Sequence, residues 1–473
     1  MAGIGDIPTG LFRGNAFYET QASFAVLNKY DQTEIANVSE SGAEDVDTAL
    51  AQAVGYSRAP LKPYARYEIL TRVRDMVTER RKLFQAAMTA EAGFPIKDAN
   101  GEIDRAVQTL TLSAEEAKRL SGEFVPFGGA PTGGGRIGFT MPLPIGIVVA
   151  ITPFNAPLNT VCHKVGPAFA AGNAVVLKPS DKTPLTANLL AQCFAEAGAA
   201  DGALAVLHGG IPVAQALLAD SRPDFYAFTG STGAGRAIQA AAGLRRTQME
   251  LGSIAATIVL ADTDIASAAA KSAAASFRKA GQVCTSIQLL MVEEPAHAEF
   301  RDAYLAEAER LVTGDPADAD TDVGPMISVE AADRVTRMLE GQRLLLGGGR
   351  DGAVMQPTII DNPQPDAEVM TKEIFGPVSC LLPIASVEEA IARVNTTPYG
   401  LASGIFTNDL QRAMSAALAL DVGGVHINET SSSRVDLMPY GGTKDSGFGH
   451  EGPKYAIREM MKEKLVTISG LPV

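Results

Sequence analysis

The segment Gly146-Ile147-Val148-Val149-Ala150-Ile151, followed by Thr152-Pro153-Phe154-Asn155, decides the fold of this chain. It is apolar and uncharged and ends near a proline, which predicts a short strand buried on both faces. Residues 157–171 are predicted to form a helix, and residues 174–178 a second buried strand. A strand, a helix and a strand in this order predict a parallel βαβ unit.

The same alternation continues along the chain. Pro184 opens another predicted helix at its first turn. Further strands are predicted at 204–208, 225–229 and 256–261. We therefore predict an α/β fold with a doubly wound parallel sheet, which binds ligands at the carboxyl ends of its strands. Polar segments lie at three such ends, namely 154–155, 178–181 and 230–232.

A second series of predicted strands and helices follows, and it carries Cys284. It begins at 264–279 and continues through 286–293, 330–346, 379–384 and 400–406. We predict a separate α/β unit there. The segment 122–136 differs from both series because it is polar and rich in Gly and Pro. Two interpretations stay open for it, a flexible loop and an excursion of strands that contacts another subunit.

The composition limits the classes of function. The chain has 473 residues and a net charge of −14. The length predicts two or three structural units, and the negative charge opposes nonspecific binding to nucleic acid or to anionic membranes. Four cysteines without a CxxC spacing predict neither a disulfide framework nor a zinc site. Because no secretory signal or long apolar run is visible, we expect a cytoplasmic protein without a metal.

Cys284 and Glu250 are the first candidates for catalysis. A thiol can attack a carbonyl group, and a carboxylate can activate the water that releases the product. Each residue alone has an ordinary alternative, a buried apolar cysteine or a solvated surface glutamate. The other segments of the chain make a shared site the better interpretation.

The segment Gly230-Ser231-Thr232-Gly233-Ala234-Gly235 follows a predicted strand and opens a helix. Backbone N–H groups at such a helix N-terminus can hold a phosphate, although the glycines do not have the GxGxxG spacing. Lys178 and Asp181, at another strand end, add a cation and a carboxylate suited to ribose hydroxyls. The structural alternatives are a plain turn, a solvated lysine and a helix cap at Ser180 or Asp181.

Taken together, these segments resemble the aldehyde dehydrogenase superfamily. The matching segments are Thr152-Pro153-Phe154-Asn155, Lys178-Pro179-Ser180, Phe228-Thr229-Gly230-Ser231, Glu250-Leu251-Gly252, Gly281-Gln282-Val283-Cys284, Glu373-Ile374-Phe375-Gly376-Pro377, Asn395 with Tyr399-Gly400-Leu401, and Pro439-Tyr440-Gly441-Gly442. They occur in the order and spacing of the family and cover nearly the whole chain. The flank from Ser431 to Asp436 and from Lys444 to Gly447 is similar to the lactaldehyde and phosphonoacetaldehyde dehydrogenase branch.

The resemblance implies an enzyme that oxidises an aldehyde to a carboxylic acid. Cys284 is the expected nucleophile, which forms a thiohemiacetal and then a thioester, and Asn155 is an expected donor to the oxyanion. Glu250 is the expected base for the water that hydrolyses the thioester. Lys164 matches a proton-relay lysine of the family, with a structural role as the alternative. Lys454 is taken as the residue at the position where many relatives carry a second carboxylate, so no relay through such a group is expected.

The resemblance also implies a nicotinamide cofactor. Glu373 matches a carboxylate that binds the nicotinamide ribose, with a salt bridge as the alternative, and Phe375 is expected near the nicotinamide ring. Asp181 is expected to bind both adenosine ribose hydroxyls, which favours NAD, whereas the adjacent Lys182 leaves NADP possible. The expected cofactor-binding residues are Thr152, Pro153, Phe154, Lys178, Ser180, Asp181, Gly230, Ser231, Gly235, Leu251, Gly252, Glu373 and Phe375.

On the substrate side, positions that are bulky in relatives are smaller and more polar here. The expected substrate-binding residues are Arg105, Asn159, His163, Val283, Thr285, Arg434 and Tyr440. Two guanidinium groups, Arg105 and Arg434, suit a carboxylate, sulfonate, phosphonate or phosphate on the aldehyde. The alternative is a local ion pair for each arginine, with Glu102 or Asp104 for Arg105 and with Asp436 for Arg434.

Ala156 stands where phosphonoacetaldehyde enzymes carry a histidine, which argues against a phosphonate. We therefore predict a hydrolytic, NAD(P)-dependent aldehyde dehydrogenase for a small polar or anionic aldehyde. The alternatives are a CoA-acylating relative, which Glu250 disfavours, and an enzyme for aromatic aldehydes. A binding protein without activity is disfavoured because Cys284, Glu250 and Asn155 occur together.

The resemblance also predicts the domain organisation. Residues 1–121 and 139–251 are expected to form the cofactor domain, and residues 252–451 the catalytic domain. Residues 122–138 and 452–473 are expected to form a bridging element that pairs subunits into a homodimer or homotetramer. The expected partner is a small-molecule aldehyde, with no nucleic acid and no membrane.

Overall fold

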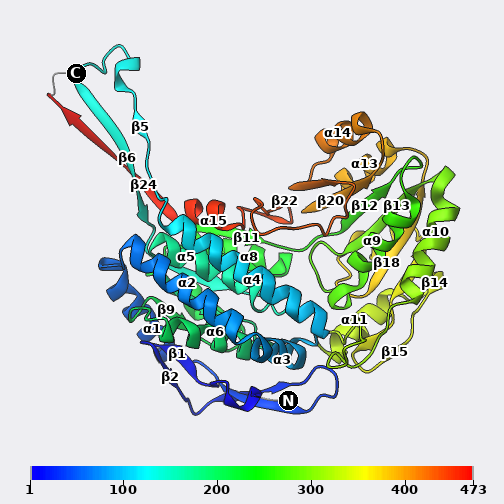
Figure 1. Ribbon diagram of the computed structural model, residues 1–473, viewed down its shortest axis with the longest axis horizontal. Coiled ribbons are helices and arrows are strands. Elements are labelled where there is room, and N and C mark those ends of the chain that lie inside the picture. The colour runs from blue at the N-terminus through cyan, green and yellow to red at the C-terminus, as the bar shows by residue number, and fades with distance from the viewer. Residues whose placement is uncertain (1–2, 471–473) are drawn as a thin grey trace.

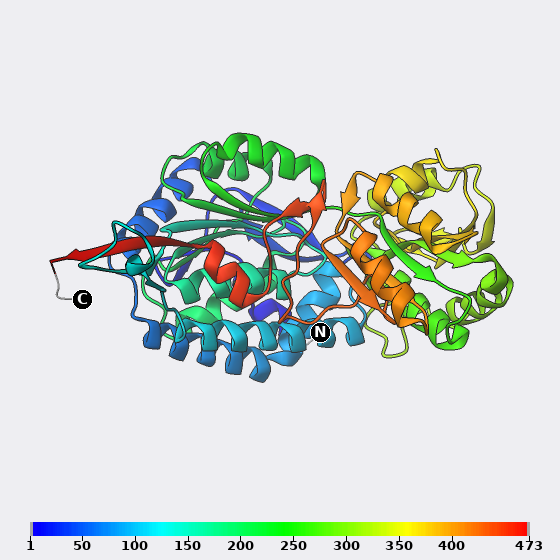
Figure 2. The same cartoon turned by 90° about the horizontal axis from the view of Figure 1, so that it is seen from above.

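The computed structural model describes residues 3–470. Two α/β units lie next to each other, and an arm of strands projects from the first unit (Figure 1). Seen from above, the units remain distinct bodies, with the arm at the end of the first unit away from the second (Figure 2). The predicted α/β fold with two units is confirmed.

The first unit is built on an eight-stranded sheet with the order β2-β1-β9-β8-β7-β10-β11-β23. Strands β9 to β11 in this order run parallel, and an antiparallel pair closes each edge. Every residue of β7 is buried, as expected for a strand covered on both faces. The strands are β1 Leu11–Arg13, β2 Ala16–Tyr18, β7 Ile147–Ile151, β8 Ala174–Lys178, β9 Leu204–Val206, β10 Phe225–Thr229, β11 Arg246–Glu250 and β23 Gly447–Phe448.

Helices cover both faces of this sheet (Figures 1 and 2). They are α1 Ala43–Arg58, α2 Pro63–Glu79, α3 Arg81–Ala92, α4 Ile96–Ala117, α5 Asn159–Ala171, α6 Pro184–Glu196, α7 Ile211–Ala219, α8 Thr232–Ala242 and α15 Pro453–Glu459. Helix α5 is buried along its whole length and ends at Gly172, whose φ of 93° is one that glycine adopts without strain. A short 3-10 helix, Ile4–Asp6, and the hairpin of β3 Ser23–Leu27 and β4 Glu34–Ser39 complete this unit.

The second unit is built on a seven-stranded sheet with the order β14-β17-β18-β13-β12-β20-β21. Its strands are β12 Ala255–Val259, β13 Ile287–Glu293, β14 Leu344–Leu346, β17 Thr358–Asp361, β18 Val378–Ile384, β20 Ala402–Phe406 and β21 Gly424–Ile427. Its helices are α9 Ile265–Phe277, α10 Glu294–Glu309, α11 Val329–Met338, α12 Glu368–Thr371, α13 Val387–Thr396 and α14 Leu410–Ala419. Two small ladders join β15 Arg350–Asp351 with β16 Val354–Met355, and β19 Tyr399–Gly400 with β22 Thr443–Lys444.

The placement of one strand differs from the prediction. Residues 256–261 were expected to belong to the first sheet, but the strand formed there, β12, pairs with β13 and β20 in the second. The place beside β10 is taken by β11, which the apolar pattern did not reveal because its first residue is an exposed arginine. An apolar run predicts that a strand is buried, but it does not specify the strand's neighbours.

The arm is a three-stranded antiparallel sheet of β5 Phe124–Val125, β6 Arg136–Pro144 and β24 Met461–Ser469. Residues 122–136 therefore contain β5 and the first residue of β6, as the strand interpretation expected, whereas contact with another subunit stays a prediction. The strands reach Pro144 and resume at Met461, whereas α15 packs against α5 and α4 in the first unit. Residues 471–473 of the predicted bridging element lie outside the described residues.

No helix within residues 3–470 is long and apolar enough to cross a membrane. The carboxyl ends of β7, β8, β10 and β11 lead into segments that border the second unit. The second unit contributes the short 3-10 turn Arg278–Gly281, which lies directly before Cys284. The fold thus places the predicted strand-end residues opposite the predicted nucleophile.

Candidate active site

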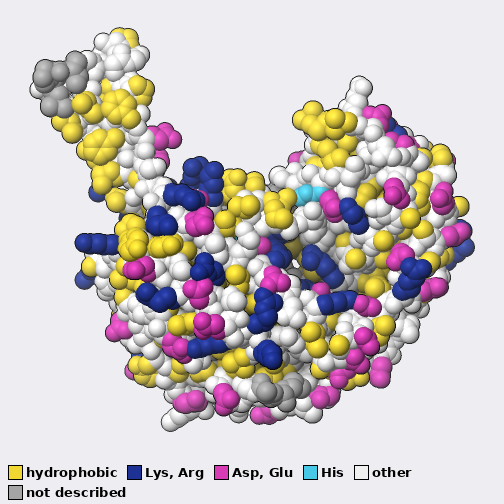
Figure 3. Space-filling view, in the orientation of Figure 1, with side chains coloured by type: hydrophobic (Ala, Val, Ile, Leu, Met, Phe, Trp, Pro, Cys, Tyr) yellow, Lys and Arg dark blue, Asp and Glu magenta, His cyan; other side chains and the backbone are white. Residues whose placement is uncertain are grey.

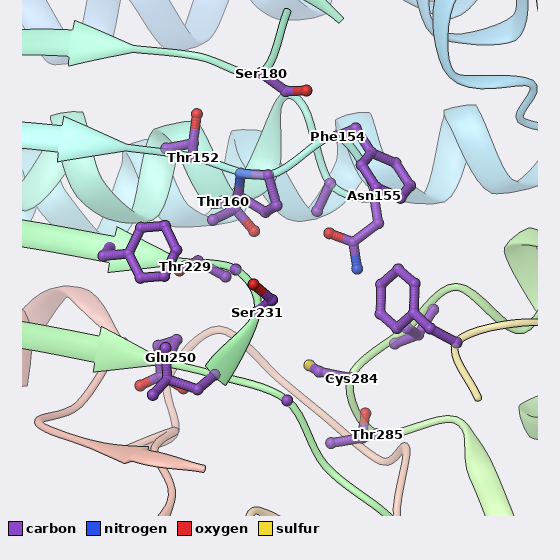
Figure 4. Close-up of a pocket in the computed structure, with 18 of the residues that line it drawn as sticks. Thr152, Phe154, Asn155, Thr160, Ser180, Thr229, Ser231, Glu250, Cys284 and Thr285 are labelled. Carbon is purple, nitrogen blue, oxygen red and sulfur yellow. The ribbon is translucent and has the colours of Figure 1, made fainter. Parts of the chain in front are cut away.

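A cavity of about 650 Å³ lies between the two units. This volume is within the range of small-molecule sites. It is lined by residues that follow β7, β8, β10 and β11 on one side and by Cys284 and its neighbours on the other. Figure 4 shows the Asn155 amide pointing toward Cys284, with Glu250 at the end of a neighbouring strand.

Most of the predicted site residues line this cavity. Those that do are Arg105, Thr152, Pro153, Phe154, Asn155, Asn159, Lys178, Ser180, Asp181, Gly230, Ser231, Glu250, Leu251, Gly252, Val283, Cys284, Thr285, Glu373, Phe375, Arg434 and Tyr440. His163, Lys164 and Gly235 are not among the lining residues. His163 and Lys164 are fully buried on α5, and Gly235 packs against Leu251.

Cys284 follows a sharp turn. Lys279 and Ala280 have φ values of 51° and 52°, and Gly281 has 67°. A Cβ atom on Gly281 would lie 1.9 Å from the Gly376 carbonyl oxygen, so only glycine fits there. The Cys284 sulfur lies 2.9 Å from the Tyr440 hydroxyl. Burial raises the pKa of the thiol to about 11, and the hydrogen bond with Tyr440 opposes this rise.

Asn155 is tied to the turn before Cys284 at both its side chain and its backbone. Its Nδ2 donates to the Gln282 carbonyl at 2.8 Å, and its own carbonyl accepts from Lys279 Nζ at 3.0 Å. Lys279 also pairs with the buried Glu102. One hydrogen of the Asn155 amide therefore holds the loop, and the second remains for another acceptor.

Glu250 ends β11, and both oxygens of its carboxyl group are buried without a hydrogen-bond partner within residues 3–470. Burial, together with the nearby charge of Glu451, raises its pKa well above the ordinary value. A carboxyl group in this state takes up a proton more readily than an exposed one. Neither of its oxygens is held by a hydrogen bond within the described residues.

Glu451 is a buried carboxylate that the sequence analysis missed. Its Oε1 lies 2.9 Å from Lys164 Nζ, and its Oε2 accepts from Arg434 at 2.6 Å. Burial disfavours its charge, but Lys164 and Arg434 outweigh this effect and lower the pKa of Glu451. The expectation that Lys454 replaces a second carboxylate is wrong, because Glu451, three positions earlier, lines the cavity. Glu451 could not be recognised from the sequence, because its partners Lys164 and Arg434 are brought to it only by the fold.

Asp436 is the second buried carboxylate of the substrate side. It accepts from Arg105 Nη2 at 2.8 Å, from Asn159 Nδ2 at 3.1 Å, and lies 2.8 Å from His163 Nε2. Burial opposes its charge, but the contacts with His163 and Arg105 lower its pKa.

The expected local partners of the two arginines are therefore wrong. Arg105 pairs with Asp436 instead of Glu102 or Asp104, and Arg434 pairs with Glu451 instead of Asp436. Both guanidinium groups are paired with carboxylates, as the ion-pair interpretation expected, but with different ones.

Arg278 is a further cation on the cavity wall and is absent from the predicted site residues. Its Nη2 donates to Ser432 Oγ at 2.8 Å, and that oxygen lies 3.4 Å from Thr285 Oγ1. Among the salt bridges of residues 3–470 it has no carboxylate partner. Burial lowers its pKa. The available signal was the pair Arg278-Lys279 in an otherwise apolar segment before a glycine.

The cofactor side combines a helix N-terminus with two groups of polar side chains. Ser231 caps α8 by accepting from the Ala234 N–H, Lys178 ends β8, and Ser180 and Asp181 follow it. Glu373 accepts from the Ser253 N–H at 2.9 Å, and burial raises its pKa to about 7.

Two close contacts test whether a nicotinamide dinucleotide fits this side. A Cβ atom on Gly252 would lie 2.7 Å from a Glu373 oxygen, so glycine is required for that carboxyl group to reach the cavity. The rings of Phe154 and Phe375 meet edge to face at 6.0 Å. These features fit such a cofactor. The helix N-terminus can hold a phosphate, a lysine and carboxylates can bind ribose hydroxyls, and Gly252 lets one carboxyl group come close.

The comparisons with known proteins agree with this site. The aldehyde dehydrogenase family profile matches residues 17–466. The chain is 44% identical over 466 residues to the 3-sulfolactaldehyde dehydrogenase of Priestia aryabhattai, covering 97% of this chain and 98% of the relative. It is 36% identical over 458 residues to the lactaldehyde dehydrogenase of Methanococcus vannielii, covering 94% and 97%. A crystal structure of aldehyde dehydrogenase 21 from Physcomitrella patens with the reaction product succinate matches with a TM-score of 0.96 and 35% identity, covering 98% and 99%.

The fold and the site thus define an NAD(P)-dependent oxidoreductase with a cysteine opposite the cofactor side. The chain belongs to the aldehyde dehydrogenase family. The predictions of the family, its lactaldehyde branch and the reaction class are confirmed.

Proposed function

We propose that the protein oxidises a small aldehyde bearing a sulfonate or carboxylate group to the carboxylic acid. The observation that carries this proposal is Arg278, a cavity-lining guanidinium whose hydrogen bond is to Ser432 rather than to a carboxylate. Its neighbour Thr285 adds a hydroxyl next to Cys284. A guanidinium flanked by hydroxyl groups suits an oxyanion of the substrate. The similarity to a 3-sulfolactaldehyde dehydrogenase supports the same class.

Arg105 and Arg434, the two arginines predicted to bind the substrate, have different roles in this proposal. Asp436 neutralises Arg105 and thereby fixes the wall formed by Asn159 and His163. Glu451 is shared between Arg434 and Lys164, so it offsets the charge of Arg434 only in part, and Arg434 Nε is buried without a hydrogen-bond partner within residues 3–470. Arg434 therefore supplies a hydrogen bond to the substrate, and Arg278 supplies a guanidinium that no carboxylate of the described residues pairs with.

The chemistry begins at Cys284. Its sulfur forms a bond to the aldehyde carbon, and the carbonyl oxygen becomes an oxyanion that accepts from the Asn155 amide and the Cys284 N–H. The residues of the cofactor side would hold NAD(P), which would supply the acceptor for the hydride of the resulting thiohemiacetal. Glu250 then takes a proton from water, which adds to the thioester, and the thiolate of Cys284 leaves. Lys164 holds the charge of Glu451 beside Glu250 and so acts through position rather than by contact with substrate.

We propose NAD as the preferred cofactor. Asp181 lines the cavity, whereas the adjacent Lys182 does not. A carboxylate at the ribose binds its hydroxyls and repels a 2′-phosphate. Initial rates with NAD and NADP test this preference, and a strong preference for NADP contradicts it.

We also propose that the protein forms homodimers or homotetramers through the arm. Phe124, Met141, Leu465 and Ile468 are exposed there, and hydrophobic side chains cover much of the arm in Figure 3. Exposed apolar patches of this kind mark contact surfaces. Analytical ultracentrifugation of the full chain tests the proposal, and a monomer contradicts it. The free thiol that the chemistry requires suits a reducing compartment, which supports the proposal of a cytoplasmic location.

Arg278→Met tests the substrate class. We expect kcat/KM for 3-sulfolactaldehyde to fall about 10- to 150-fold, because hydrogen bonds between charged groups contribute about 1.5–3 kcal/mol. The value for neutral lactaldehyde should change little. Arg105→Met is the matched control, because its charge is already neutralised, and it should not discriminate between the two aldehydes. Equal losses on both aldehydes for Arg278→Met would contradict the anionic substrate.

A further inference from the structure

The sulfur of Cys284 makes a single side-chain hydrogen bond within the described residues, and its partner is Tyr440. The distance from Sγ to the Tyr440 hydroxyl is 2.9 Å, and within residues 3–470 the sulfur makes no other hydrogen bond. Glu250, the expected base of the site, has no hydrogen-bond partner there and thus does not contact the thiol. The hydroxyl of Tyr440 is therefore the polar side-chain group in direct contact with the nucleophile in this structure.

Tyr440 is held in place by two neighbours. Its N–H donates to the Glu451 carbonyl at 3.2 Å, and the Glu451 N–H donates back at 2.7 Å. The guanidinium carbon of Arg434 lies 3.7 Å from the centre of its ring, and Arg434 itself pairs with the Glu451 carboxylate. Backbone bonds, a covered ring face and a buried ion pair fix the direction in which the hydroxyl points.

The chemistry of the pair sets which atom donates. Burial and the neighbouring Cys284 raise the pKa of Tyr440 well above its ordinary value, so the phenol keeps its proton when the thiol loses one. A thiolate has no proton to give and accepts hydrogen bonds. The other charged or titratable groups around the sulfur are Arg434, Glu250, Glu373 and Arg278. None of these is within hydrogen-bond distance of the sulfur in this structure.

We propose that Tyr440 is a catalytic residue that donates a hydrogen bond to the Cys284 thiolate. The thiol proton leaves to bulk water before attack, and Tyr440 keeps its own proton throughout. When the sulfur bonds to the aldehyde carbon, its charge moves to the carbonyl oxygen and the hydrogen bond weakens. When water adds to the thioester, the carbon–sulfur bond breaks and the hydroxyl again stabilises the departing thiolate. Tyr440 thus stabilises the Cys284 thiolate both before it attacks the aldehyde and when it leaves the thioester.

The proposal rests on Cys284 as the nucleophile of the proposed function, but its test needs no aldehyde. The measurement is the rate of alkylation of Cys284 by iodoacetamide as a function of pH, with the modified peptide identified by mass spectrometry. Tyr440→Phe keeps the ring under Arg434 and removes only the hydroxyl. We expect the midpoint of the profile to move upward by about one pH unit, with about tenfold slower alkylation below it and an unchanged plateau at high pH.

Tyr64→Phe, an exposed tyrosine of α2, is the matched control and should leave the profile unchanged. An unchanged midpoint in a folded Tyr440→Phe enzyme would overturn the proposal, and so would a lower plateau without a shift. If Tyr440→Phe fails to fold, 3-fluorotyrosine at position 440 provides the second test. Its more acidic phenol is a stronger donor, so the midpoint should move downward. A shift upward or none would again overturn the proposal. Failure of the substrate proposal would leave this alkylation profile unaffected.

Discussion

The cofactor side and the substrate side of the cavity are built in different ways. On the cofactor side, side chains follow directly after β7, β8, β10 and β11, so the parallel sheet alone brings them to one edge. On the substrate side, the positions depend on ion pairs between distant segments, such as Arg105 with Asp436. Backbone topology thus positions the residues of the cofactor side, and ion pairs position those of the substrate side. We therefore expect substitutions on one side to leave the function of the other side unchanged.

Glu250→Gln is expected to have the largest effect. Steady-state kcat should fall about 10²- to 10⁴-fold, the usual contribution of a general base, while one turnover of NADH still forms. The wild-type rate should rise with pH, because Glu250 acts as a base only after losing a proton and its pKa is raised well above the ordinary value. The variant should lose this rise. Glu299→Gln on the exposed side of α10 is the control. A requirement for CoA in the wild type would overturn the hydrolytic assignment.

Asn155→Ala should have the next largest effect. Loss of an oxyanion donor lowers kcat about 10²- to 10³-fold. Affinity for NAD should stay unchanged, because the side chain and carbonyl of Asn155 contact Gln282 and Lys279 in the turn before Cys284. Stopped-flow measurement of NADH formation and a separate NAD titration distinguish the two quantities. Asn37→Ala, at an exposed position of β4, should change neither. A loss confined to NAD affinity would contradict the division of the cavity into two halves.

Asp181→Ala should have the smallest effect. Interactions of exposed charges contribute about 0.2–1 kcal/mol, so kcat/KM with NADP relative to NAD should rise by a factor of about 1.4 to 5. Lys182→Ala should lower the same ratio if this lysine tolerates the 2′-phosphate. Initial rates with both cofactors measure the effect. A fall in the ratio for Asp181→Ala would show that its carboxylate does not repel the phosphate.

The two halves also differ in how much the sequence predicts. The strand-end segments at 152–155 and 178–181 were predicted with their positions in the sheet, because local patterns determine strands and turns. Arg278 and Glu451 were not assigned, and Asp436 was paired with the wrong arginine, since a charged residue reveals its partner only when the chain has folded. The strand β12 was placed in the wrong sheet for the same reason, since its neighbours are set by the folded chain. The sequence indicates which residues are buried, whereas their contacts come from tertiary structure.

The ladder between β6 and β24 has a consequence for the order of folding. It joins Arg136–Pro144 to Met461–Ser469, so the rest of the first unit and the whole second unit are synthesised between its two strands. Closing so long a loop is entropically unfavourable unless the intervening units are already compact. The arm can therefore form only on a chain whose two units have been made. An unfinished chain would lack the paired arm and be kept from associating through it.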